Sequence, residues 1–91
     1  RYPGIRSDSD MYTLGYSFEP WTDAKAIADG PSILDYVNRV ADKYDIRRHI
    51  RFHHHVTRAS FDSEQALWTV EVQRKDTGET ARFTCHWLHM C

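Results

Sequence analysis

The spacing of hydrophobic and polar positions changes near residue 48, and this change predicts a helix followed by strands. Over residues 31–45, apolar side chains recur at the spacing of one helical face. The residues of this stripe are Ile33, Val37, Val40, Ala41 and Tyr44. Asp29-Gly30-Pro31 precedes the stripe as a start signal, because proline is favoured in a first helical turn. We therefore predict an amphipathic helix over 31–45 that packs on a sheet.

Beyond residue 48, apolar and polar residues alternate as they do in strands. The predicted strands cover residues 50–53, 56–61, 68–73, 81–87 and 88–91. Turns are expected at 62–65 and at Asp76-Thr77-Gly78, a sequence typical of a hairpin. The central strands thus form an antiparallel β-meander. The short strand before it and the apolar returning strand after it suit a parallel sheet whose other strands lie outside this chain.

Residues 1–31 follow neither period and are rich in proline, glycine and aromatic residues. Long segments of this kind in compact domains are usually functional, and the aromatic residues argue against disorder. The first ten residues carry charges of both signs, on Arg1, Arg6, Asp8 and Asp10. Charges buried here must be paired, because an unpaired buried charge is costly. A solvated loop is the alternative that composition alone leaves open.

Charge and composition argue against several classes of function. The 91 residues include 12 basic and 13 acidic ones, and a net charge of −1 gives no electrostatic case for nucleic acid or an anionic membrane. No apolar run reaches the roughly 18 residues that span a bilayer, and no signal-peptide pattern is present. Cys85 and Cys91, about 20 Å apart on an extended strand, cannot form a disulfide. Free thiols favour a cytoplasmic location.

The six histidines raise the hypothesis of a zinc site. On a strand, His53 and His55 share one face, and Cys85, His89 and Cys91 also share a face. Thiolate and imidazole suit zinc, but the sequence lacks a C-x-x-C or a helical H-x3-H pair. We therefore assign no metal ligand. A stand-alone small binding module, linked to zinc through its histidines, is kept as the alternative function.

Motifs for nucleophilic catalysis and for phosphate binding are missing from the sequence. No G-x-S-x-G elbow occurs. The glycines stand at positions 4, 15, 30 and 78, too far apart for a phosphate-binding loop. A nucleotide bound to this chain would therefore take its phosphate-binding turn from residues elsewhere.

Residues 1–8 read R-Y-P-G-x-R-x-D, and Tyr16-Ser17-Phe18 reads Y-S-F. Together these stretches resemble a motif of flavin-containing Baeyer–Villiger monooxygenases. Residues 7–16 are similar to the bacterial subgroup that includes ethionamide-activating monooxygenases. The similarity continues at residues 33–37, 49–54, 68–70 and 88–91, so it covers essentially the whole chain. On this resemblance the chain is an internal fragment of a larger enzyme.

The resemblance implies an α/β fold, namely a partial FAD-binding Rossmann-like domain. Its parts would be a loop, a helix, a short strand, an antiparallel β-meander and a returning strand. Residues 1–91 would form the central part of an FAD/NAD(P)-binding domain that is incomplete at both ends. The glycine-rich turns for FAD and NADPH would lie in the remainder of the parent chain, so the fragment alone is expected to be inactive.

The resemblance also assigns site residues. Asp8 matches a catalytic carboxylate near the flavin, which positions a mobile arginine that lies outside this chain. Arg6 and Ser7 match positions on the nicotinamide side, and Val56 matches a position whose backbone meets the FAD adenine. Leu14 stands where many relatives have a flavin-proximal tyrosine, which favours the bacterial subgroup. These five residues are the predicted cofactor-binding set.

The implied reaction of the parent enzyme uses FAD, NADPH and O2. NADPH reduces the flavin, oxygen adds to form a C4a-peroxyflavin, and the peroxide attacks a ketone to give an ester or lactone. Small sulfur-containing molecules are the second class of substrate. The cofactor carries the chemistry, and the protein orients and shields it.

Overall fold

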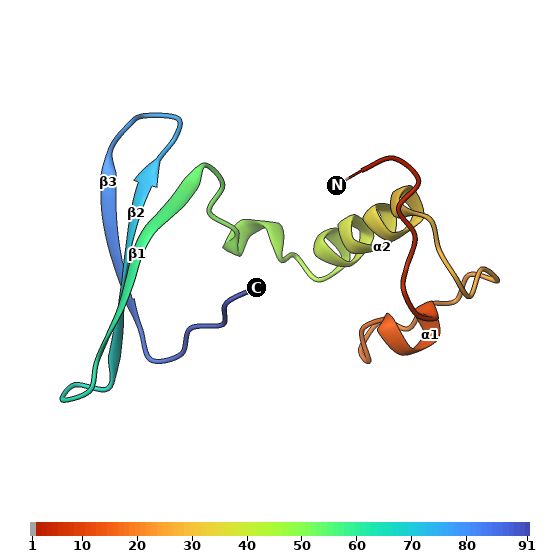
Figure 1. The fold of residues 1–91 in the computed structure, drawn as a ribbon, viewed down its shortest axis with the longest axis horizontal. Coiled ribbons are helices and arrows are strands. Elements are labelled where there is room, and N and C mark those ends of the chain that lie inside the picture. Colours follow the sequence, from red (N-terminus) through yellow and green to blue (C-terminus); the bar gives the residue numbers. More distant parts are fainter. Residues whose placement is uncertain (1) are drawn as a thin grey trace. The chain divides into compact units, whose positions relative to one another are not determined.

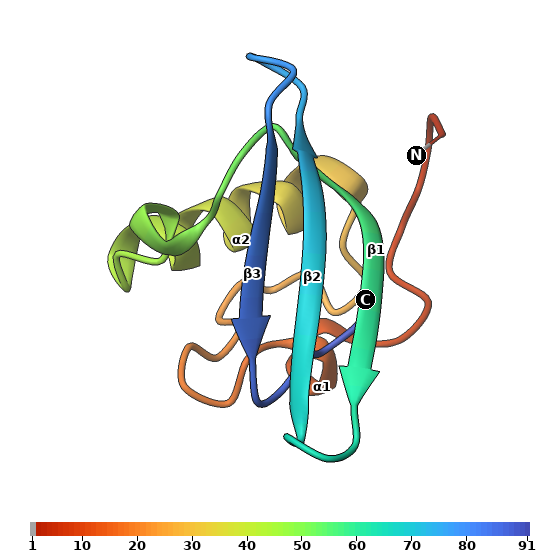
Figure 2. The same ribbon diagram turned by 90° about the vertical axis from the view of Figure 1, so that its left-hand side faces the viewer.

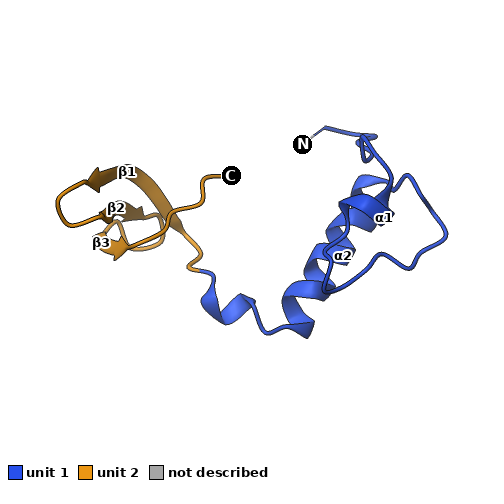
Figure 3. Cartoon of the chain, turned by 90° about the horizontal axis from the view of Figure 1, so that it is seen from below, with its two compact units in different colours: residues 1–50 blue, residues 51–91 orange. Residues whose placement is uncertain are grey.

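The computed structural model describes residues 2–91, which divide into two compact units between residues 50 and 51 (Figure 3). Arg1, the first residue of the motif noted above, lies outside the described residues. The first unit contains α1 (Met11–Leu14), α2 (Gly30–Lys43) and the 3-10 turn η1 (Arg47–His49) (Figure 1). The second contains β1 (His54–Asp62), β2 (Leu67–Arg74) and β3 (Thr80–Cys85).

The predicted helix is confirmed as α2, and its start follows from the local sequence. The Asp29 carboxylate accepts hydrogen bonds from the Ser32 backbone N–H at 3.3 Å and from the Ser32 hydroxyl at 2.8 Å. These bonds satisfy the Ser32 donors at the N-terminus of the helix, where backbone N–H groups have no partner within the helix. Pro31 sits in the first turn, where its missing N–H costs nothing.

The core of the first unit forms between α2 and the loop that precedes it. Its buried residues are Met11, Trp21, Ala28, Tyr36 and Val40. Of the predicted apolar stripe, Val40 is buried and Ile33 partly buried, whereas Val37 and Tyr44 are more than 40% exposed. Tyr36, outside the predicted stripe, is only 3% exposed. Within this unit, the loop is therefore the packing partner of the helix.

The second unit is an antiparallel sheet of order β1-β2-β3, in which the strands follow one another as a meander (Figure 2). The register pairs Val56 with Val72 in β1 and β2, and Val70 with Phe83 in β2 and β3. A bulge at Thr57 interrupts the first ladder. The predicted antiparallel meander is confirmed, with a first strand that begins two residues earlier than expected.

Two predicted strands are wrong. Residues 50–53 form no strand, because η1 precedes them and Phe52–His53 make a turn in which His53 has a φ of 58°. A left-handed residue breaks the extended conformation that a strand needs. Residues 88–91 also form no strand, and β3 ends at Cys85. An extended segment counts as a strand only when a neighbour accepts its backbone hydrogen bonds, and the second unit provides none there.

The described residues therefore contain a helix and an antiparallel sheet, and the parallel, Rossmann-like part of the predicted domain stays a prediction. Among residues 2–91, no helix is both long and apolar enough to cross a membrane.

Candidate functional site

An open pocket of about 360 Å³ in the first unit brings together four of the five residues predicted to bind cofactor. The four are Arg6, Ser7, Asp8 and Leu14. The other residues lining the pocket are Met11, Tyr16, Ile33, Tyr36 and Val37. One wall thus comes from the opening segment and α1, and the other comes from α2.

Backbone pairing fixes the opening segment against the residues that lead into α2. The Gly30 N–H donates to the Ile5 carbonyl at 2.8 Å, and the Ser7 N–H donates to the Ala28 carbonyl at 2.9 Å. The Ser7 hydroxyl oxygen also accepts a bond from the Ala28 N–H at 3.1 Å. Since a hydroxyl can accept and donate at the same time, Ser7 can still donate its proton to another group.

Asp8 and Asp10 lie two positions apart but have different environments. The Asp10 carboxylate caps α1, accepting from the Thr13 N–H and from the Thr13 hydroxyl, each at 3.0 Å. The Asp8 carboxylate is exposed and forms no hydrogen bond or ion pair within residues 2–91. Its oxygens are therefore available to a donor from a ligand or from another part of the protein.

The second wall contains residues that the sequence analysis did not assign to the site. Ile33 and Val37 lie four positions apart on α2 and face the pocket together. Tyr36 lies between them in sequence, and its hydroxyl donates to the Glu19 carbonyl at 2.6 Å and accepts from the Tyr16 N–H at 2.9 Å. The helical spacing of Ile33 and Val37 was visible in the sequence, but it indicated only core packing.

The pocket is amphiphilic. Leu14, Ile33 and Val37 offer apolar surface, the Tyr16 ring stacks on the Tyr36 ring with centroids 5.8 Å apart, and a polar edge adjoins them. A flat ring with polar substituents on one side suits such a surface, because the apolar wall buries the ring while the polar edge satisfies its substituents. The arrangement can orient an aromatic heterocycle and exclude water from one of its faces.

Two carboxyl groups of the first unit, those of Asp29 and Glu19, have lowered pKa values. The Ser32 hydroxyl, and then the Lys25 ammonium at 3.3 Å, lower the pKa of Asp29 from 3.8 to about 2. Glu19, whose carbonyl meets Tyr36, accepts a bond from Lys43 at 2.6 Å, and this bond lowers the pKa of the Glu19 carboxyl. Both carboxylates are therefore charged at neutral pH and hold the loop to α2.

Val56, the fifth predicted residue, lies in β1 of the second unit and pairs with Val72. Its side chain is 54% exposed. The predicted contact of its backbone with adenine stays a prediction.

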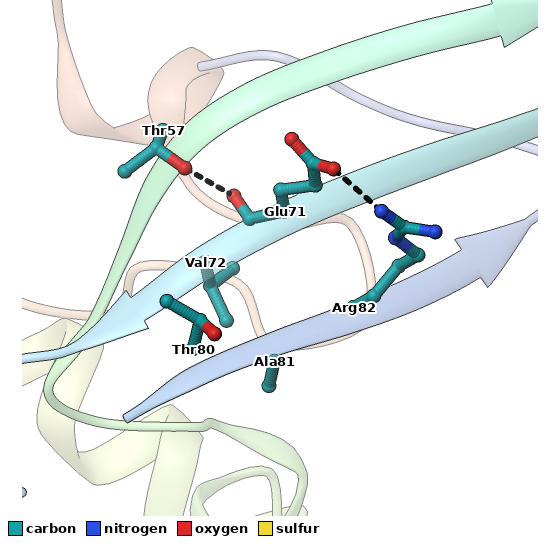
Figure 4. A pocket seen from close by; sticks show the side chains of 6 residues that line it. All are labelled: Thr57, Glu71, Val72, Thr80, Ala81 and Arg82. Carbon is teal, nitrogen blue, oxygen red and sulfur yellow. Dashed lines mark hydrogen bonds and ion pairs between the residues drawn. The ribbon is translucent and has the colours of Figure 1, made fainter. Parts of the chain in front are cut away.

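A second open pocket, of about 350 Å³, lies on the sheet (Figure 4). Its residues are Thr57, Glu71, Val72, Thr80, Ala81 and Arg82. The Thr57 hydroxyl donates to the Glu71 carbonyl at 3.2 Å, and Arg82 donates to the Glu71 carboxylate at 2.9 Å (Figure 4). Because these polar groups bond to one another, this pocket is a weaker candidate for a ligand site than the pocket of the first unit.

The histidines form no evident metal centre. Among the described residues, no group of three or more His, Cys, Asp or Glu side chains is placed to hold a metal ion. His54 instead places its Nδ1 2.6 Å from the Phe52 carbonyl oxygen, which is a local contact at the start of β1.

Comparison with known proteins relates the chain to flavoenzymes. No family model matches it. It is 54% identical to the FAD-containing monooxygenase EthA of Mycobacterium tuberculosis H37Rv and 48% identical to that of Mycolicibacterium smegmatis, each over all 91 residues. The chain is a relative of FAD-containing monooxygenases. It spans 18% of the length of either relative.

A solved structure agrees with these relatives. The chain superposes on an oxidized steroid monooxygenase bound to NADP with a TM-score of 0.69 and 39% sequence identity. The match covers 90% of this chain and 16% of the steroid monooxygenase. The resemblance stated from the sequence is therefore confirmed, and the comparisons lend no support to a zinc-binding module.

Proposed function

We propose that residues 1–91 belong to an FAD- and NADPH-dependent monooxygenase that inserts oxygen into ketones. The observation that supports this most strongly is the pocket that Arg6, Ser7, Asp8 and Leu14 line, because the fold places these residues opposite residues 33–37 of α2. The similarity to FAD-containing monooxygenases over all 91 residues supports the same class of enzyme.

The size and lining of the pocket fit part of a cofactor. Its volume of about 360 Å³ lies in the range of small ligand sites. A ring can rest against the apolar side chains, whereas a whole dinucleotide needs a phosphate-binding turn that the chain lacks. We propose that the flavin and nicotinamide rings meet at this pocket, where bound FAD supplies the activation of oxygen.

Within this site, the residues of the chain would bind and orient the rings of the cofactors and shield them from water. Leu14, Ile33 and Val37 would pack against a ring and keep water from it. The Ser7 hydroxyl would donate to a polar substituent, and the exposed Arg6 guanidinium would attract an anionic group of the nucleotide. These contacts require no change in the backbone pairing described above.

Asp8 is the residue that we propose acts closest to the chemistry. An ionised carboxylate only accepts hydrogen bonds, and its two oxygens match the fork of a guanidinium group. Asp8 stands exposed at the pocket with no such donor among residues 2–91. We therefore propose that an arginine from the rest of the enzyme binds Asp8 and is held by it against the nicotinamide.

A purified full-length protein that carries residues 1–91 would test the proposal. The expected preparation shows flavin absorption and consumes NADPH faster when a cyclic ketone is added. The ketone, O2, NADPH and a proton should yield a lactone, water and NADP⁺, with the new oxygen between the carbonyl carbon and its neighbour. A protein without flavin, or one whose NADPH consumption yields no oxygenated product, would contradict the proposal.

Oxygenation of sulfur is a second candidate for the same site, since a thioether also accepts one oxygen atom. Mass spectrometry of products from a cyclic ketone and from an aryl methyl sulfide, supplied separately with ¹⁸O2, distinguishes the two activities. A labelled lactone supports ketone oxygenation, whereas a labelled sulfoxide alone assigns the enzyme to heteroatom oxygenation.

A further inference from the structure

We propose that Tyr36 is a positioning residue, whose hydroxyl fixes the Tyr16 ring as a wall of the nucleotide pocket. This inference rests on the proposed function of the pocket. Tyr36 is 3% exposed and belongs to the core of the first unit, yet its ring also lines the pocket. Tyr36 therefore belongs both to the core that packs against α2 and to the surface that a ligand would touch.

The hydroxyl of Tyr36 bonds both ends of one tight turn. It accepts from the Tyr16 N–H at 2.9 Å and donates to the Glu19 carbonyl at 2.6 Å. The turn is closed by a bond from the Glu19 N–H to the Tyr16 carbonyl at 3.1 Å. Without the hydroxyl, one backbone donor and one backbone acceptor would lose their partners in a partly buried place, which is costly.

A second tyrosine holds the middle of the same turn. The Tyr44 hydroxyl donates to the Phe18 carbonyl at 2.8 Å, and the two rings meet edge to face at 5.0 Å. Neither of these residues lines the pocket, whereas Tyr16 and Tyr36 both do. Ring stacking also holds the Tyr16 side chain, which lies against Phe18 at 5.2 Å and Tyr36 at 5.8 Å, while the hydroxyl of Tyr36 holds the backbone of the turn.

This geometry predicts an effect on binding and not on the chemical step. Tyr16 is 43% exposed, and its ring is also stacked on Phe18 and Tyr36. If its backbone is released, its ring can shift against these neighbours, and the nicotinamide nucleotide loses part of a contact surface. Weaker ground-state binding raises KM, while kcat stays close to its original value.

The test uses the full-length flavin-loaded enzyme with Tyr36→Phe, which keeps the ring and removes the hydroxyl. The matched control is Tyr12→Phe, because the Tyr12 hydroxyl also donates to a backbone carbonyl, of Asp23 at 3.0 Å, and Tyr12 does not line the pocket. Hydrogen exchange is measured at the Tyr16 and Glu19 amides, and NADP⁺ binding is measured by calorimetry.

For Tyr36→Phe we expect about tenfold faster exchange at both amides and about fivefold weaker NADP⁺ binding, consistent with the loss of one or two hydrogen bonds. The KM for NADPH should rise by a similar factor with kcat within about twofold. Tyr12→Phe should leave all these values unchanged. Faster exchange with unchanged NADP⁺ binding would reduce Tyr36 to a structural role and overturn the proposal, as would unchanged exchange.

A measurement without substitution gives an independent check. In the original enzyme, saturating NADP⁺ should slow exchange at the Tyr16 amide, and no slowing would overturn the proposal. A full-length protein that carries no flavin would instead contradict the proposed function, and hydrogen exchange in Tyr36→Phe would still decide whether the hydroxyl fixes the turn.

Discussion

Among single residues, the two aspartates Asp8 and Asp10 are close in sequence but have different environments. Asp10 uses its carboxylate to cap α1, while Asp8, two positions earlier, leaves its carboxylate exposed at the pocket. The difference arises because the short helix starts at Met11, so only the residue directly before it can cap. Asp10 therefore has a role in folding, and the role in binding that we propose for Asp8 is compatible with its free carboxylate.

The two aspartates give a matched pair of substitutions. In the full-length enzyme, Asp8→Asn should lower kcat/KM for NADPH by about tenfold to a hundredfold, because a charge-assisted bond to a guanidinium group is lost. Asp10→Asn should change it less than twofold, since asparagine caps helices as well as aspartate does. Steady-state kinetics with NADPH measure both. Equal effects of the two substitutions would argue against the assignment of Asp8.

Gly15 is a residue whose small size the structure requires. A Cβ atom at this position would lie 3.0 Å from the Met11 carbonyl oxygen and 3.2 Å from the Trp21 backbone nitrogen. Both neighbours are backbone atoms, which cannot move aside as a flexible side chain can. We expect Gly15→Ala to destabilise the first unit by about 1–3 kcal/mol. An unchanged melting temperature in thermal unfolding would contradict this close approach.

At the scale of elements, α2 organises the first unit because its two ends and one face hold different stretches of the preceding loop. Its cap Asp29 adjoins the paired segment that carries Ser7. Its buried Tyr36 holds the Tyr16 turn, and Lys43 in its last turn holds Glu19. The pocket consequently forms only where the loop packs against the helix.

The cap of α2 makes a prediction about pH. Because the pKa of Asp29 is lowered from 3.8 to about 2, its charged form is favoured in the folded state. The stability that it contributes is fully present above its unfolded pKa of 3.8 and is lost as the pH falls toward 2. Carbon-13 NMR of labelled aspartate carboxyls, assigned with Asp29→Asn, should show this low value.

A substitution in the same cap serves as the control. The Ser32 hydroxyl is the largest cause of the lowered pKa, so Ser32→Ala should raise the pKa of Asp29 toward 3.8. The loss of stability on acidification should then be smaller and should be complete at a higher pH. A pKa that does not move in Ser32→Ala would show that this hydroxyl does not hold the charge.

At the scale of the whole molecule, residues 2–91 bury few side chains for their number. The buried apolar residues are Met11, Trp21, Ala28, Tyr36, Val40 and Val72, and five of them lie in the first unit. Val72 is thus the buried apolar residue of the sheet. A three-stranded sheet without a covered apolar face is marginal in water. The sheet of the second unit is therefore expected to be marginally stable by itself.

We therefore predict that a polypeptide of residues 1–91 alone unfolds without a sharp transition and binds no FAD. Calorimetry should show a broad, weak heat signal, and a hydrophobic dye should bind at neutral pH. Titration with FAD should leave flavin fluorescence unchanged, because the chain has no phosphate-binding turn. A cooperative transition together with stoichiometric FAD binding would contradict the prediction.

Elements with strong local signals could be predicted from the sequence alone. Helical spacing with Asp29 and Pro31 predicted α2, and alternation around Asp76-Thr77-Gly78 predicted the meander. The motifs of residues 1–8 and 7–16 predicted the family and named the four residues that line one pocket. These features are readable because each depends on neighbours a few positions away in the chain.

Contacts between residues far apart in sequence became clear only in the folded structure. The strand expected at 50–53 is interrupted by a turn with a left-handed His53, and the strand expected at 88–91 has no partner strand in the second unit. The sequence pattern indicated only that Tyr36 belongs to a helix, but the fold buries Tyr36 and brings its hydroxyl to Tyr16 and Glu19. Contacts between residues about 20 positions apart depend on how the loop folds back on α2, and no local pattern in the sequence records that path.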